Sequence, residues 1–215
     1  VGVANTVGFL ERLDARVRSS FDPAVIHFHP YNADELREIL FQRARLGLRD
    51  GCWEPGAISY IAARVAAESG DARRAINVLR MAAEIAEREN SMKLTVEHAR
   101  RAMTAVDEQE LVAVIRNLPL HHKLVLLAIT ELLLRRDPRP GTGSVYREYL
   151  RIVRSRFVEP LTMRRVSGII NELASQGLIT TRMDYRGAYG NTKVVESMAA
   201  PPEVIKRMFS SMGLI

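Results

Sequence analysis

At 215 residues, with 47% hydrophobic and 26% charged side chains, the chain is long enough for one or two domains with their own cores. Its single cysteine, Cys52, excludes an intrachain disulfide and is typical of a reducing compartment, and no apolar run reaches the roughly 18 residues of a membrane span. The net charge of +6 lies wholly in residues 108–215, because the first 107 residues carry equal numbers of basic and acidic side chains.

The first thirty residues contain two short segments of strand-like composition. Residues 1–4 are typical of the end of a buried strand, with Asn5 at its tip, and residues 25–28 predict a second short strand after a short helix at 7–13. A lone strand end cannot bury both of its faces. We therefore expect the chain to be the C-terminal part of a larger protein.

Amphipathic helices dominate the next part of the chain. The predicted spans are 33–45, 57–69, 72–90 and 96–106, each with apolar residues at helical spacing. Asn32 or Asp34 can cap the first of these helices, Gly70 ends the second, and Asp71 can cap the third. Four helices of this length predict a small helical bundle.

A winged helix-turn-helix is predicted in the second half. A connecting helix and a core helix, at 107–117 and 120–135, precede a basic amphipathic helix that begins near residue 142. After a break at 158–160 the sequence predicts a second amphipathic helix, two β-like runs around a Gly-rich basic tip, and a short final helix; these spans are 163–177, 178–183, 192–197 and 203–210. Helix, turn, helix, hairpin is the order of a winged helix, which places its second helix in the DNA major groove. We therefore expect this half to bind duplex DNA.

The helix ending at Gly177 has the two faces of a recognition helix. At about 100° per residue, the apolar face that we expect to be buried contains Val166, Ile169, Ile170 and Leu173. Arg164 and Asn171 lie opposite this face, where they can form bidentate contacts with guanine and adenine edges. Thr162 can cap the helix beside a phosphate.

Between positions 135 and 193, basic side chains outnumber acidic ones by 12 to 5, as expected for a polyanion-binding surface. The candidate DNA contacts on the two helices are Arg147, Arg151, Thr162, Arg164, Arg165, Ser167 and Asn171. Those in the wing are Tyr185, Arg186, Tyr189, Asn191 and Lys193. A solvated basic face, or a winged helix that binds protein, is the alternative that this composition leaves open.

The residues form no complete catalytic set. The sequence contains no G-x-x-x-x-G-K-[ST] phosphate loop, no Ser/His/Asp arrangement that we would assign and no predicted metal site. GDAR at 70–73 places an arginine in the first turn of a helix, from which it can reach an anion, although a capped helix with a surface arginine is the default interpretation. Whether the chain is an enzyme is therefore undecided from its residues alone.

Several motifs occur in a specific order. They are LDARVRSSF at 13–21, FHPYNADELREIL at 28–40, GDARRAINVLRMA at 70–82, VYREYL at 145–150 and MRRVSGIINELASQGLI at 163–179. Together they resemble the archaeal origin-recognition/cell-division-cycle replication initiators, AAA+ ATPases related to the eukaryotic origin recognition complex. The resemblance covers essentially the whole chain.

The resemblance implies a mainly α fold in three parts. These are a C-terminal remnant of the AAA+ ATPase core at 1–30, a helical AAA+ lid at 31–106, and a winged-helix DNA-binding domain with a small β-hairpin wing at 107–215. The implied function is initiation of DNA replication: binding of origin duplex DNA under ATP/ADP control and recruitment of the replicative helicase. Other initiator subunits would be partners, no membrane is expected, and the location would be cytoplasmic and nucleoid-associated.

The resemblance also implies roles for single residues in a site for ATP or ADP with Mg²⁺. Asn5 would be the sensor 1 residue and Arg73 the sensor 2 arginine, whereas Arg18, or alternatively Arg16, would be an arginine finger directed at a neighbouring subunit. The adenine contacts would be Tyr31 and Asn32.

Parts of the family's pattern are absent from this sequence. The phosphate loop, the Walker B acidic residues and the DNA-contacting insertion of the ATPase domain would all precede Val1. We therefore expect the chain alone neither to hydrolyse ATP nor to bind it tightly. Two other functions remain open, a nucleotide-switched transcriptional regulator and a winged-helix module that mainly binds protein during helicase loading.

Overall fold

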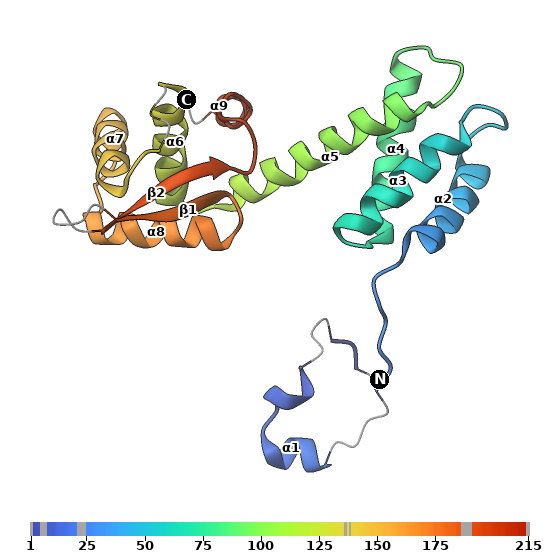
Figure 1. Ribbon diagram of the computed structural model, residues 1–215, viewed down its shortest axis with the longest axis horizontal. Helices are drawn as coiled ribbons and strands as arrows, with labels where there is room; N and C mark the ends of the chain where they lie inside the picture. Colours follow the sequence, from blue (N-terminus) through green and yellow to red (C-terminus); the bar gives the residue numbers. More distant parts are fainter. Residues whose placement is uncertain are drawn as a thin grey trace. The chain divides into compact units, whose positions relative to one another are not determined.

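The computed structural model describes residues 2–4, 8–20, 25–135, 137, 139–185 and 191–213 (Figure 1). Within these residues it is mainly helical, with one two-stranded antiparallel sheet, which confirms the predicted fold class. The chain divides into two compact units, Val1–Asp107 and Glu108–Ile215, and each contains a buried apolar cluster of its own.

The two strands predicted in the first thirty residues are wrong. Residues 2–4 and 25–28 belong to no β-ladder of the described chain, and between them lie the 3-10 helix Leu10–Arg12 and the helix α1, Ala15–Ser20. Val25, Ile26 and Phe28 have the composition of a strand, but they are exposed and have no partner strand with which to form a ladder.

The helices of the first unit begin and end at residues whose chemistry explains them. These helices are α2 (Ala33–Gly47), α3 (Pro55–Glu68), α4 (Ala72–Arg88) and the first part of α5 (Val96–Asn117). Asn32 and Glu35 form a capping box at α2, and the Asp71 side chain accepts the backbone N–H groups of Arg73 and Arg74 at α4. The predicted bundle therefore forms around Leu36, Ile61, Val78, Ala102 and other fully buried side chains.

Gly70 joins the segment before α2 to this bundle. Its φ of 63° is a left-handed conformation, and a Cβ at this position would lie 2.6 Å from the Pro30 side chain and 2.7 Å from the Tyr31 carbonyl oxygen. The Tyr31 N–H donates to the Gly70 carbonyl oxygen at 3.0 Å. Only glycine permits this close approach without strain.

Helix α5 is longer than the sequence pattern suggested. We predicted one helix ending at 106 and another beginning at 107, whereas α5 runs without interruption from Val96 to Asn117. Residues 107–110, DEQE, contain no helix breaker, and the first proline after Val96 is Pro119. A change of composition at position 107 therefore does not end the helix.

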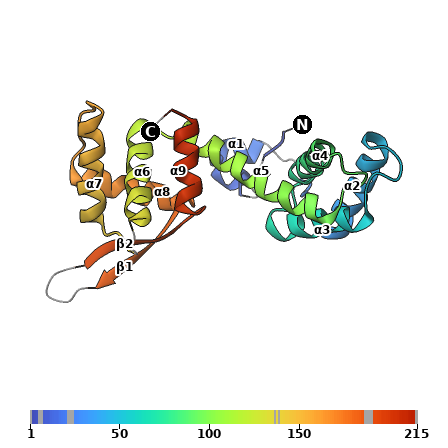
Figure 2. The ribbon, with the colours of Figure 1, turned by 90° about the horizontal axis from the view of Figure 1, so that it is seen from above.

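The second unit has the predicted order of a winged helix (Figure 2). Its elements are α6 (Leu120–Leu134), α7 (Thr142–Ser155), α8 (Met163–Ser175), β1 (Ile179–Tyr185), β2 (Asn191–Met198) and α9 (Pro202–Ser211). The strands are antiparallel with Ile179 opposite Met198, and a bulge lies between Thr180 and Thr181. Helix α6 is the centre of the core, since its residues 124–130 are all buried.

The final helix, whose role the sequence did not indicate, belongs to this core. Ile205, Met208 and Phe209 are buried, and α9 packs on α6. The Lys206 ammonium lies 2.9 Å from a carboxylate oxygen of Glu131 on α6. No helix among the described residues has both the length and the apolar character that a membrane crossing requires.

Candidate nucleic-acid interface

Two tyrosines of α7 hold the turn that leads into α8. Tyr149 is fully buried, and its hydroxyl accepts the N–H of Leu161 at 3.0 Å and lies 2.8 Å from Nδ1 of His121. The Tyr146 hydroxyl donates to the carbonyl oxygen of the same Leu161 at 3.3 Å. Burial raises the pKa of the Tyr149 phenol, so this group stays a neutral hydrogen-bonding partner. The start of α8 is thereby fixed relative to α7.

The inner face of α8 is the one that periodicity predicted. Val166, Ile169, Ile170 and Leu173 are all buried. Thr162 is the N-cap, and its hydroxyl accepts the N–H of Arg165 at 3.4 Å. The opposite face is therefore the one that α8 can present to a ligand.

On the outer face of α8 the two adjacent arginines have different surroundings. Arg164 is exposed and has no acidic partner in the described part of the chain. Arg165 forms an ion pair with Glu172, with 2.6 Å between Nη1 and Oε1. Ser167 is half-buried, and the amide oxygen of Asn171 accepts a hydrogen bond from the Lys193 ammonium.

Lys193 connects the wing to both helices. Its backbone carbonyl accepts the Thr142 hydroxyl at 3.2 Å at the start of α7, while its side chain reaches Asn171 on α8. Tyr185 and Asn191 are ladder partners at the end of the hairpin. The other wing candidates, Arg186 and Tyr189, lie outside the described residues, so the structure leaves their predicted contacts untested.

The arginines of α7 are exposed, as predicted, but only some are unpaired. Arg147 has no acidic partner among the residues that the structure describes. The Arg151 guanidinium donates twice to Oε1 of Glu148, at 3.0 and 2.5 Å, and Arg135 donates to the other oxygen at 3.4 Å. Arg147 is therefore more available to a phosphate than Arg151.

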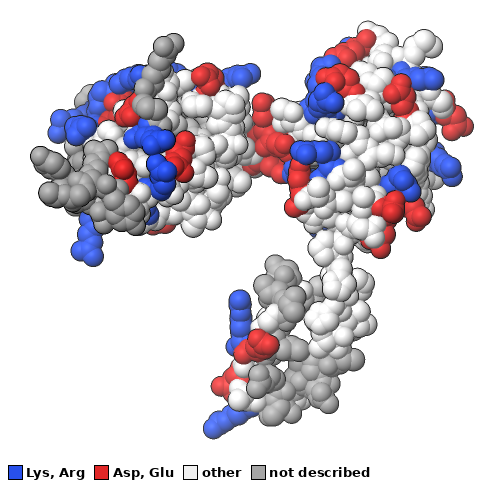
Figure 3. All heavy atoms as spheres, in the orientation of Figure 1, with Lys and Arg blue, Asp and Glu red and all other residues white. Residues whose placement is uncertain are grey.

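Sequence reasoning missed Glu148, a buried carboxylate in the middle of this basic helix. The hydrogen bond from Arg151 holds the pKa of Glu148 below its usual value, against the effect of burial, and Arg135 adds to the lowering. Glu148 precedes Arg151 by three residues, a spacing that predicts an ion pair on a helix. Figure 3 shows Lys and Arg side chains on one face of this unit.

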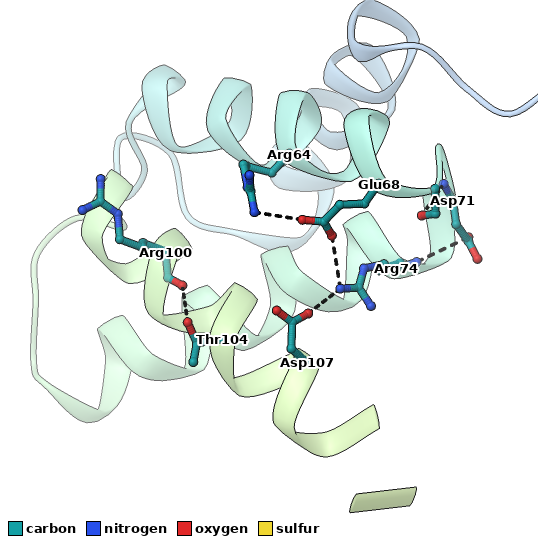
Figure 4. A network of polar contacts seen from close by, with 8 residues as sticks. Arg64, Glu68, Asp71, Arg74, Arg100, Thr104 and Asp107 are labelled. Carbon is teal, nitrogen blue, oxygen red and sulfur yellow. Dashed lines mark hydrogen bonds and ion pairs between the residues drawn. The ribbon is translucent and has the colours of Figure 1, made fainter. Parts of the chain in front are cut away.

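In the first unit, the segment GDARR places two neighbouring arginines in different surroundings, and Figure 4 shows the contacts of the second, Arg74. Arg74 lies within hydrogen-bonding distance of Asp107 on α5 and donates to Glu68 on α3 at 3.4 Å; Glu68 also accepts from Arg64 at 2.9 Å. Arg73 is exposed, and no acidic group of the described chain pairs with its guanidinium. Arg74 thus connects three helices, while Arg73 remains available to an anion.

The structure describes only some of the remaining candidates for the nucleotide site. Tyr31 is exposed, and the Asn32 side chain is already occupied by the N–H groups of Asp34 and Glu35. Asn5 lies outside the described residues. Arg16 and Arg18 lie on α1, and the side chain of Arg18 is not among those described. The described residues therefore leave the roles predicted for these candidates untested.

Two protein-family models match most of the chain. Residues 37–104 match the Cdc6 AAA+ ATPase-type lid domain, and residues 113–207 match the CDC6 C-terminal winged helix domain. The chain is 43% identical over 206 residues to an ORC1-type DNA replication protein of Desulfurococcus amylolyticus, covering 96% of this chain and 52% of the relative. The chain belongs to the ORC1/Cdc6 family.

Other relatives agree with this membership. ORC1-type DNA replication protein 1 of Sulfurisphaera tokodaii is 43% identical over 96% of this chain and 52% of its own length. The structure of the Aeropyrum pernix ORC1 protein in complex with DNA is similar with a TM-score of 0.82 and 38% identity, covering 97% of this chain and 54% of that one. The predicted family is thus confirmed, and this ORC1/Cdc6 chain spans about half the length of the curated relatives it matches.

Glu148 gives this ORC1/Cdc6 winged helix a pH-dependent contribution to its stability. Because the folded-state pKa of Glu148 is lowered, this contribution is fully present above its ordinary pKa of 4.5 and is lost as the pH falls through the folded value. We expect Glu148→Gln to lower the free energy of unfolding by about 1–3 kcal/mol at neutral pH. Urea denaturation should show that the difference in the free energy of unfolding between this variant and the wild type decreases when the pH is below the ordinary pKa of Glu148.

The matched control is Glu159→Gln, which removes an exposed carboxylate from the turn between α7 and α8. The free energy of unfolding of this variant should stay within about 0.5 kcal/mol of the wild-type value, both at neutral pH and below the ordinary pKa of Glu148. A difference for Glu148→Gln that does not change with pH would contradict the assignment of its stabilisation to the ionised carboxylate.

Proposed function

We propose that the protein binds origin duplex DNA through α7, α8 and the wing, and acts as a DNA replication initiator. The observation that carries this proposal is the pair Arg147 and Arg164, exposed on the two helices of a winged helix and without acidic partners in the described chain. Thr162 and the first turn of α8, which contains Arg164, would hold a phosphate. The DNA complex of the similar Aeropyrum pernix ORC1 protein supports the same use of this fold.

The remaining DNA contacts are part of the same proposal. Arg151, Arg165, Ser167 and Asn171 would support contacts to phosphates and bases, and the wing candidates Tyr185, Arg186, Tyr189, Asn191 and Lys193 would follow the adjacent backbone. Phosphate contacts would position the domain, and base contacts of α8 would select the sequence.

Control by ATP or ADP with Mg²⁺ in a complete ATPase is a further part of this proposal. The fit rests on Arg73 in the first turn of α4, because its guanidinium is exposed and no described acidic group pairs with it. Asn5 as sensor 1, Arg18 or Arg16 as arginine finger, and Tyr31 and Asn32 near adenine would complete the chain's share. The bound Mg²⁺ nucleotide would supply the phosphoryl chemistry.

The proposal extends to partners and to the organisation of the chain. Residues 1–30 would be part of an ATPase core, 31–106 the lid and 107–215 the DNA-binding domain. Other initiator subunits and the replicative helicase would be recruited at the origin, in the cytoplasm on the nucleoid. The competing readings are a nucleotide-switched transcriptional regulator and a domain that mainly binds protein.

Titration of the chain with a fluorescent duplex of about 20 base pairs tests the DNA part directly. We expect binding that weakens with salt, with a log–log slope of about −3 to −5, since each neutralised phosphate contributes about −0.9. Absence of binding at low salt would contradict the proposal and favour the protein-binding alternative. Footprinting then separates the other two functions, because protection of repeated origin elements supports initiation and protection of promoter operators supports regulation.

A further inference from the structure

Glu172 is a carboxylate on the helix that we propose to face DNA. It lies in the last turns of α8, and its two oxygens have different partners. Oε2 lies 2.6 Å from Nε2 of the buried His122 on α6, and Oε1 lies 2.6 Å from Nη1 of Arg165 at the start of α8. One carboxylate thus connects the core of the unit to its outer surface.

The Arg165 side chain follows the axis of α8 to reach this partner. Glu172 is seven residues further along, two turns of helix on the same face. Gly168 lies between them, and a Cβ at that position would be 3.6 Å from Nη1 of Arg165. The guanidinium therefore lies across the one position of the outer face that carries no side chain, and Arg164 beside it has no comparable restraint.

The ionisation of Glu172 is consistent with this arrangement. The hydrogen bond from His122, followed by that from Arg165, holds the pKa of Glu172 below its usual value. The carboxylate is therefore charged at neutral pH. A negative charge on this face repels the phosphates of DNA, so its presence lowers the general affinity of the surface for a duplex.

We infer that Glu172 is a positioning residue that holds Arg165 in one orientation and thereby increases discrimination between DNA sequences while lowering affinity for DNA in general. Five N–H groups are available on a guanidinium, and one engaged with Glu172 leaves the others for a base edge. An arginine that is already oriented loses less conformational freedom on binding, and a bidentate contact with guanine requires a defined orientation. This inference rests on the proposed DNA binding.

Glu172→Gln in the full chain separates the two effects. Binding to a single fixed duplex of arbitrary sequence should become about two- to fivefold tighter, because one repulsive charge is removed. Base preference should decrease, which is measured by selecting bound duplexes from a pool with a randomised central segment. At the positions that the wild type selects, base preference should fall about fivefold or more.

Two further variants keep the test independent of folding. Glu159→Gln removes an equal, exposed charge from the turn before α8 and should leave the base preference unchanged. Arg165→Lys preserves the charge and leaves the contact between Glu172 and His122 intact, but it replaces the planar guanidinium, so it should lose the same preference as Glu172→Gln.

The outcomes distinguish this inference from the proposed function. A wild-type chain that binds no duplex overturns the DNA-binding proposal itself. A wild type that binds without base preference overturns only the role of Glu172, as does a Glu172→Gln or Arg165→Lys chain that retains the full preference of the wild type. Loss of the preference in both variants, with Glu159→Gln unaffected, supports it.

Discussion

Replacing Arg147 and Arg164 together by alanine is expected to weaken duplex binding by about 100-fold at low salt. One arginine lies on α7 and the other on α8, both are exposed, and neither has an acidic partner in the described residues. Because no internal ion pair competes for them, each can contribute a full phosphate or base contact, which is worth about 1–3 kcal/mol when it reads a base. Fluorescence anisotropy with the same duplex at several salt concentrations measures the change.

The matched control removes the same charge from the other unit. Arg43 and Arg49 are exposed arginines of the first unit, without a described acidic partner, and their double alanine variant has the same net charge as the Arg147/Arg164 variant. It should retain wild-type affinity within about threefold, since every arginine of the proposed α7–α8 surface stays in place. Equal weakening in both variants would show that net charge, rather than the α7–α8 surface, determines binding.

Phe209→Ala is expected to destabilise the second unit by about 3–5 kcal/mol. The Phe209 ring is fully buried where α9 packs on α6, and its removal leaves a cavity in the core. Urea denaturation, monitored by circular dichroism, should show that this unit unfolds at a lower urea concentration than in the wild type. Because the chain contains two compact units, the curve is fitted with two transitions.

Phe157→Ala is the control for this substitution. The Phe157 side chain is 99% exposed at the end of α7, so the same change of residue type removes no core packing. Its effect should stay within about 0.5 kcal/mol. A small effect of Phe209→Ala as well would mean that α9 contributes little to the fold.

The parts of the structure that depend on local pattern could be predicted from the sequence. The buried stripe of α8 follows from the spacing of its apolar residues, and the cap at Thr162 from its hydroxyl. Strand formation at 25–28 could not be judged in this way, because a strand is stabilised by a neighbour that composition does not reveal. The continuity of α5 could not be judged in this way either, because the polar run 107–110 interrupts the apolar spacing although it contains no helix breaker.

The sequence predicts which residue types occupy the candidate site, but it does not predict which arginines form ion pairs with carboxylates. The sequence identifies Arg151 and Arg165 as exposed basic residues, yet both form ion pairs, with Glu148 and Glu172 respectively. These pairs depend on side-chain orientation within the folded helix. The contact of His122 with Glu172 joins residues 50 positions apart, and helical periodicity carries no information on such a contact.

The continuity of α5 determines how the two units can be separated. In the sequence they divide between Asp107 and Glu108, in the middle of a hydrogen-bonded helix. Because proteases cut backbone that can open locally, this junction should resist nicking better than an extended linker would. A fragment beginning at Glu108 would keep the turns of α5 that carry Leu111, Val112 and Ile115, which pack in the core of the second unit. A winged-helix fragment that begins at Val96 would retain the whole helix but would expose Ala102, Met103 and Val106, which are buried in the first unit. Cutting the helix at either place therefore changes the surface of one unit or the other.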